Sequence, residues 1–138
     1  YVAAATTTGL TTLQNIYGLT FTAAANSKYI FEVYLSASCD VGNTGYRVGM
    51  NYSAAGATIE STAVGKTSSA AMRSDRISAF NTENGGSFGT AVGDAGAIIK
   101  GVITTGANTG NITAQIEKIT ANNVTVYADS YMRITKVI

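Results

Sequence analysis

Hydrophobic and polar residues alternate with a period of two along much of the chain, which is the pattern of half-buried β-strands. The clearest run covers residues 46–52. Its alternate positions put four large side chains on one face of a strand: Tyr46, Val48, Met50 and Tyr52. We therefore predict a strand here with this face directed into a core.

A second run, residues 28–39, carries large groups on both faces. One face holds Phe31, Val33, Leu35, Ala37 and Cys39. The opposite face holds Ile30, Glu32, Tyr34 and Ser36. Because both faces carry large groups, we predict a strand that is covered on both sides.

The rest of the chain divides into similar short segments separated by Gly, Asn and Ser clusters, which suit tight turns. Further strands are predicted at Thr11–Tyr17, Leu19–Thr22, Ala57–Thr62, Met72–Phe80, Ala97–Thr105, Asn111–Ile119 and Val124–Ile138, the last breaking near Ala128–Ser130. About eight to ten short strands without helical crossovers predict an all-β fold, an antiparallel β-sandwich or jelly roll.

The pattern predicts one domain with an extension and a long loop. Residues 1–9 read as an extended N-terminal arm, and residues 10–138 as a single jelly-roll-like β domain. The glycine-dense stretch 85–96 reads as a loop, and long loops are often functional. We expect the arm and the 81–96 loop to reach neighbouring subunits. Since the chain opens at Tyr1, we expect a processed product, a fragment or the ordered part of a longer protein.

Composition removes several classes of function. The chain has no His, Pro or Trp, and a single Cys, which excludes His-dependent triads, imidazole metal sites and an intrachain disulfide. Charged residues make up 12%, against about a quarter in an average domain. A net charge of +1 gives no footprint for nucleic acid. No apolar run approaches the length of a membrane span. We therefore expect neither nucleic acid nor a membrane as a partner.

Four local patterns suggest chemistry, and each has a simpler interpretation. Val64–Thr67 contains Gly-Lys-Thr, as a P-loop does. A P-loop also needs a glycine five positions before Gly65, and that position is Glu60, so we predict a surface turn. Asp40 with Asn43, or Asp94 with Asp129, could line a calcium site, but no ligand-dense loop exists. Cys39 lacks an activating His and is predicted to be buried. We therefore predict no catalytic residues, no metal and no cofactor.

The tyrosines leave two interpretations open. Tyr17, Tyr34, Tyr52, Tyr127 and Tyr131 could form a sugar-stacking surface or could pack at seams between subunits. Three Asn-x-Ser/Thr sequences begin at Asn51, Asn111 and Asn123. Without a visible secretory signal, chance in an Asn- and Thr-rich chain explains them better than glycosylation does.

Two segments share an order of strands and turns. The first runs from Leu19 through an Ala-Asn turn and Phe31-Glu32 to Leu35, and continues through Gly45–Asn51. The second comprises Ile99–Thr105, Gly110–Ile116 and a closing strand that starts at Ser130-Tyr131. The arrangement resembles a small β-rich domain of tailed-phage virion proteins. The resemblance implies a jelly roll that assembles as trimers in capsid decoration, fibres or tail parts, without catalytic residues.

These observations favour a non-enzymatic structural protein of a tailed-phage virion, a capsid decoration (cement) protein that stabilises the shell through trimeric contacts. Expected partners are further copies of the chain and the major capsid protein or other virion proteins. The expected location is the virion, assembled in the host cytoplasm. The alternatives are a fibre or tail component, or a receptor-binding module for surface glycans; a glycoside-active enzyme ranks last. The residues expected to contact partners are Tyr1, Val2, Leu10, Tyr17, Tyr34, Tyr52, Phe88 and Tyr131.

Overall fold

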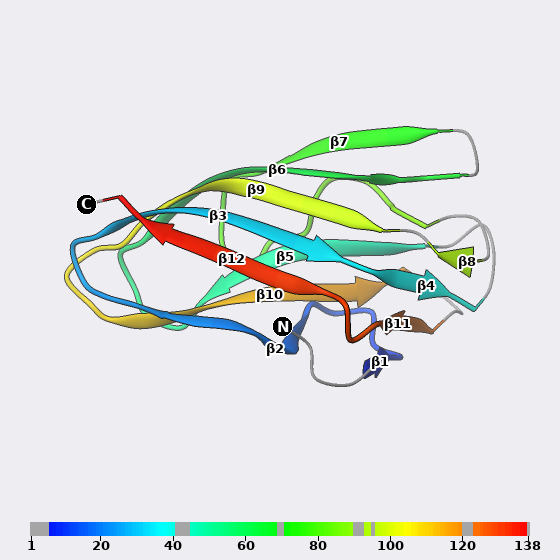
Figure 1. Cartoon of the computed structure of the whole chain (residues 1–138), viewed down its shortest axis with the longest axis horizontal. Coiled ribbons are helices and arrows are strands. Elements are labelled where there is room, and N and C mark those ends of the chain that lie inside the picture. The colour runs from blue at the N-terminus through cyan, green and yellow to red at the C-terminus, as the bar shows by residue number, and fades with distance from the viewer. Residues whose placement is uncertain are drawn as a thin grey trace.

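A computed structural model describes residues 6–40, 45–68, 71–89, 93–94, 96–119 and 123–137. Over these residues the chain is all-β, with twelve strands and no helix (Figure 1). The strands are β1 (Thr6–Thr8), β2 (Gln14–Ala23), β3 (Lys28–Leu35), β4 (Ala37–Cys39), β5 (Tyr46–Tyr52), β6 (Thr58–Lys66), β7 (Met72–Ile77), β8 (Gly93–Asp94), β9 (Ala97–Thr104), β10 (Gly110–Lys118), β11 (Val124–Val126) and β12 (Tyr131–Lys136). The count exceeds the predicted eight to ten because four strands have only two or three residues.

The strands form antiparallel sheets packed as a β-sandwich with a jelly-roll-like course. One sheet has the order β12-β3-β9-β6-β7 and the other β2-β10-β5. The chain passes from one sheet to the other between β2 and β3, and again between β5 and β6. A small sheet, β1-β11-β4-β8, closes the end opposite the C-terminus (Figure 1). The predicted fold class is confirmed.

The core lies between the two large sheets and follows the predicted alternation. The 46–52 face is buried as expected, from Tyr46 at 0% exposed to Tyr52 at 5%. On β3, Phe31, Val33 and Leu35 are buried. Each large side chain buried in this way contributes about 1.5–3 kcal/mol through removal of apolar surface from water.

The opposite face of β3 corrects one prediction. Glu32 and Tyr34 are half-buried and Ile30 is 53% exposed, so the strand is covered on one face only. The large outward groups pack along the sheet instead: Tyr34 stacks on Tyr131 of β12 with ring centroids 5.5 Å apart, and Glu32 pairs with Lys100 of β9 at 2.7 Å.

The N-terminal segment also differs from its prediction. Thr6–Thr8 pairs with Val124–Val126 of the same chain, so this part of the expected arm is a strand of the domain itself. The pairing satisfies backbone groups that an extended arm would have offered to a neighbour. Residues 1–5, including Tyr1 and Val2, lie outside the described residues.

The expected 81–96 loop is packed against the sandwich over the part that the structure describes. The amide of Asn81 donates to the Met50 carbonyl at 2.8 Å. Phe88 bridges to Tyr46 as in a β-ladder and is fully buried. Residues 90–92 and 95 lie outside the described ranges, while Gly93–Asp94 forms β8 against β4. The described part of this segment therefore extends the sheet edge within the chain.

Candidate binding groove on the three-stranded sheet

The outer face of the three-stranded sheet is polar along its central strand. On β10, Ile112, Ala114 and Ile116 point into the core. The alternate positions carry Asn111, Thr113, Gln115 and Glu117. All but the first of these four are buried although they face outward. Neighbouring segments must therefore cover this face.

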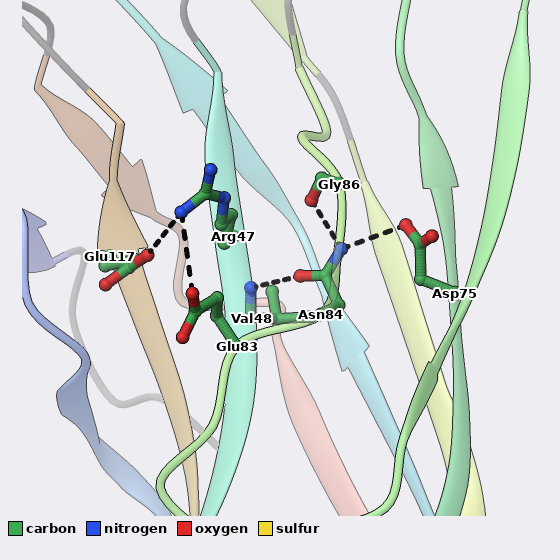
Figure 2. A network of polar contacts seen from close by, with 7 residues as sticks. All are labelled: Arg47, Val48, Asp75, Glu83, Asn84, Gly86 and Glu117. Carbon is green, nitrogen blue, oxygen red and sulfur yellow. Dashed lines mark hydrogen bonds and ion pairs between the residues drawn. The ribbon is translucent and has the colours of Figure 1, made fainter.

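Arg47 joins two carboxylates at one end of this face. Its Nη1 lies 3.5 Å from Glu117 Oε1 and 3.7 Å from Glu83 Oε1 (Figure 2). Burial, and then the nearby Glu83 charge, raise the pKa of Glu117 above its ordinary value, while Arg47 opposes the shift. Because one guanidinium holds both carboxylates, the arrangement fits a structural ion pair.

Asn84 fastens the segment after β7 to β5 and β7. Its side chain is fully buried, and its Oδ1 accepts from the Val48 amide at 2.7 Å (Figure 2). Its Nδ2 donates to the Gly86 carbonyl at 2.5 Å and to Asp75 Oδ2 at 3.2 Å. These bonds hold residues 81–84 along the edge of β5, where they cover part of the polar face.

A bulge in β2 covers the other side. Thr20 pairs with Thr113, yet Asn15 pairs with Gln115, so five steps along β2 oppose two along β10. Gly18 sits within the bulge at φ 89°, a left-handed conformation that glycine adopts without strain. Bulges re-aim side chains, and here Tyr17 is turned outward and is 83% exposed.

Between the bulge and β10 lies a groove of about 680 Å³. Its walls include four amide side chains and several apolar ones, and none of its lining residues is charged. Glycine at position 49, opposite Gln115 in the ladder, leaves the space that Leu13 fills, since a Cβ there would lie 2.9 Å from Leu13 Cδ1. The lining includes Leu10, Leu13, Asn15, Tyr17, Asn51 and Gln115.

The amides in the groove are partly bonded to one another. Gln115 Nε2 donates to Asn15 Oδ1 at 3.1 Å and to Asn81 Oδ1 at 3.3 Å. Asn51 Nδ2 approaches the same Asn15 oxygen at 3.4 Å. Gln115 is only 5% exposed, and its Oε1 has no hydrogen-bond partner among the described residues. A buried acceptor without a donor marks a place where a bound molecule can supply one.

The residues expected to contact partners separate into four pairs. Leu10 and Tyr17 both line the groove and are exposed. Tyr34 and Tyr131 stack on the outer face of the other sheet and stay half-buried. Tyr1 and Val2, as noted, lie outside the described residues.

Tyr52 and Phe88 correct the list of contact residues. Tyr52 is 5% exposed and donates its hydroxyl to the Asn108 carbonyl at 2.6 Å. Phe88 packs its ring against Tyr46, with centroids 6.0 Å apart. Both side chains belong to the core: Tyr52 is on the inward face of β5, and Phe88 is brought there by its bridge to Tyr46.

The other candidate chemistries gain no site from the structure. Among the described residues, no three His, Cys, Asp or Glu side chains gather as metal ligands. Asp40 accepts from the backbone and side chain of Asn123. Cys39 is buried as predicted. The surface turn predicted at Val64–Thr67 is wrong for its first three residues, which are the end of β6 and pair with β7, and Gly65 is buried there.

Sequence reasoning missed four residues of this face: Asn15, Asn51, Asn84 and Gln115. The alternation within 111–119 puts Gln115 on the face opposite Ile112, Ala114 and Ile116, which is the signal that the sequence offers. The bulge that brings Asn15 beside it, and the burial of Asn84, depend on contacts between distant segments.

No protein-family model matches this chain, and no curated protein matches its sequence. Over the part of the chain that the structure describes, no helix is long and apolar enough to cross a membrane.

Proposed function

We propose that this protein is a non-enzymatic structural component of a tailed-phage virion, a capsid decoration (cement) protein that acts as a homotrimer. It adds apolar and hydrogen-bonded contacts at seams of the shell and performs no chemistry. Its partners are further copies of the chain and the major capsid protein, and it joins the particle in the host cytoplasm.

The pairing of charges within the chain carries this proposal. Five of the eight carboxylates are within 4 Å of an Arg or Lys nitrogen of the same chain. Because these ions already have partners, burying the surface in an assembly strips water from fewer isolated charges. Among the described residues, large apolar side chains are exposed as well: Leu10, Tyr17, Phe21, Ile30, Met72 and Val137.

The test is the mass of the protein in solution and its binding to shells. Light scattering should give three times the 14.2 kDa chain mass, and the protein should bind undecorated capsids of the phage that encodes it. Glu substitutions, one at a time, at the six exposed apolar positions should locate the interface. A monomer at high concentration that binds no capsid contradicts the proposal.

The groove favours a second candidate function, recognition of cell-surface glycans by a fibre or tail component. An exposed tyrosine beside a row of amide side chains suits a polyhydroxylated ligand better than it suits a flat protein seam. A glycan array separates the two candidates, since a cement protein has no need to bind saccharides. Reproducible saccharide binding favours the second candidate, and its absence together with capsid binding favours the first.

A further inference from the structure

We propose that the groove between the β2 bulge and β10 binds a neutral saccharide. Tyr17 packs against a sugar ring, and the amides of Asn15, Asn51 and Gln115 form hydrogen bonds with its hydroxyl groups. This inference rests on the second candidate function, glycan recognition, and assigns it a site and a class of ligand.

The groove has the size of a small-molecule site and a lining suited to a polar ligand. Its volume of about 680 Å³ falls within the range of ordinary ligand pockets, about 300–1,000 Å³. Its lining is more polar than apolar, with Leu10 and Leu13 beside the amide side chains. This combination provides area for the C–H faces of a sugar and direction for its hydroxyl groups.

The amides are held in place before any ligand binds. Two donors, from Gln115 and Asn51, converge on Asn15 Oδ1, which fixes the Asn15 amide plane and turns its nitrogen away from them. Asn15 is exposed, so its N–H groups can donate to a ligand. Amides held in advance lose less conformational freedom on binding.

Gln115 supplies the observation that points to a ligand. Its Nε2 is used twice within the chain, whereas its Oε1 is buried and lacks a donor among the described residues. Less than 1 Å² of this oxygen is accessible, so a small shift of the Gln115 side chain has to open it before a ligand hydroxyl, or one ordered water, can donate to it. A ligand rich in hydroxyls satisfies it, and an apolar ligand does not.

Tyr17 adds the aromatic surface. An isolated aromatic side chain gains nothing from being 83% exposed to water, and the bulge with Gly18 at φ 89° is what turns it outward. An aromatic ring brings a large rigid contact area at low entropy cost. The ring therefore serves as a platform at the mouth of the groove.

The absence of charge in the lining selects neutral ligands. Neither a cation nor an anion is among the residues that line the groove, so a sialylated or sulfated sugar would lose hydration without gaining a partner. Binding should consequently be insensitive to salt, since no ion pair forms.

The experiment is saturation-transfer NMR of the intact chain. The probes are neutral oligosaccharides of glucose, galactose, mannose, rhamnose and N-acetylglucosamine, together with sialylated and sulfated ones. At least one neutral probe should bind. Tyr17→Ala should weaken it about tenfold and Tyr17→Phe should retain it.

A matched pair of amide variants tests the location. Asn51→Ala removes a groove amide, whereas Asn111→Ala removes an exposed amide on the same sheet face that does not line the groove. Asn51→Ala should weaken binding several-fold and Asn111→Ala should leave it unchanged. Thermal melts of each variant confirm that all remain folded.

Three results overturn the inference. If a neutral saccharide binds equally to the wild type, Tyr17→Ala and Asn51→Ala, the site is wrong and glycan recognition stands. If only charged probes bind, and bind more weakly in salt, the ligand class is wrong. If no probe binds, both the site and glycan recognition are wrong, and the cement function is still tested separately by capsid binding. Loss of the trimer in Tyr17→Ala would then show that the groove contacts a neighbouring copy of the chain.

Discussion

Two buried amide side chains, Asn84 and Gln115, differ in how completely they are hydrogen-bonded within the chain. Asn84 uses both ends of its side chain within the chain, on Val48, Gly86 and Asp75. Gln115 uses its nitrogen within the chain and leaves its oxygen without a described donor. The first amide replaces backbone pairing at a sheet edge, and the second lies where a ligand can complete its bonding.

Replacing Asn84 should destabilise the fold. Asn84→Ala leaves the buried Val48 amide without its side-chain acceptor, and an orphaned buried group costs about 1–3 kcal/mol. Chemical denaturation should show a loss of about 2–4 kcal/mol in the free energy of unfolding, once the bonds to Gly86 and Asp75 are included. The control is Asn108→Ala, which removes an exposed amide and should change stability by less than about 0.5 kcal/mol. Equal effects in the two variants would contradict this role.

Asp75 should make stability depend on pH. Its hydrogen bond to Arg73, 2.6 Å long, is the main cause that lowers its pKa from the ordinary 3.8. A carboxyl with a lowered folded-state pKa stabilises the protein above its unfolded value and loses this contribution as pH falls through the folded value. The free energy of unfolding of the wild type should therefore exceed that of Asp75→Asn by about 0.5–1 kcal/mol at pH 6. The difference is small because Arg73 is half exposed and screened by water.

The decisive measurement for Asp75 is the unfolding free energy of both proteins between pH 6 and pH 2. The difference should shrink once the pH falls below 3.8. In an Arg73→Gln background, most of this pH dependence should disappear. If the difference stays constant over the range, the Arg73 pair does not stabilise the charged carboxyl.

At the scale of elements, alternation in the sequence located strands better than it located their irregularities. The run 46–52 became β5 with the expected face inward, and the break near Ala128–Ser130 separates β11 from β12. The two strands predicted at Thr11–Tyr17 and Leu19–Thr22 are one strand, β2, with a bulge between them. The bulge keeps both Ile16 and Leu19 in the core. Because these residues are three positions apart, it interrupts the period-two alternation by which a strand is recognised in the sequence.

Packing between β6 and the segment after β7 can be tested at Gly65. A Cβ at this position would lie 2.6 Å from the Phe88 ring, and Phe88 is fully buried. Gly65→Ala should therefore destabilise the protein by about 1–3 kcal/mol, as overpacked cores do. Thermal and chemical unfolding measure the effect.

Gly85 provides the matched control for Gly65. A Cβ there would meet nothing within 4 Å, so Gly85→Ala should change stability by less than about 0.5 kcal/mol. In addition, Phe88→Leu should reduce the penalty of Gly65→Ala, because the smaller side chain relieves the contact. Equal destabilisation by both alanines would show that Phe88 is not packed on β6 in this way.

At the scale of the whole molecule, the surface combines paired charges with separate apolar groups. The outer face of the five-stranded sheet holds Glu32 with Lys100, and Glu60 with Arg76. Arg133 lies over the Tyr131 ring, 5.6 Å from its centroid. Such a surface suits close contact with neighbours because its charges are neutralised locally.

The proposed trimer should consequently resist salt. Contacts that are apolar and hydrogen-bonded are little screened, so the mass by light scattering should stay constant from about 0.05 to 0.5 M NaCl. A control at the same concentrations is Ile30→Lys, which adds an isolated cation to an exposed position and makes any assembly through that face depend on salt. Dissociation of the wild type in salt would show that ion pairs between chains hold the assembly.

The sequence by itself determined the class of fold, the inward faces of the main strands and the poverty of catalytic groups. These properties are local, because an alternation with a period of two, or a residue that favours a turn, can be recognised from a few consecutive residues. It predicted neither the pairing of Thr6–Thr8 within the chain nor the burial of Phe88. It also gave no sign of the β2 bulge beside Gln115. These features depend on which distant segments meet, and only the packed sandwich decides that: closing the sheets over one core sets which outward amides are covered, which aromatic ring is left in water, and where a groove remains.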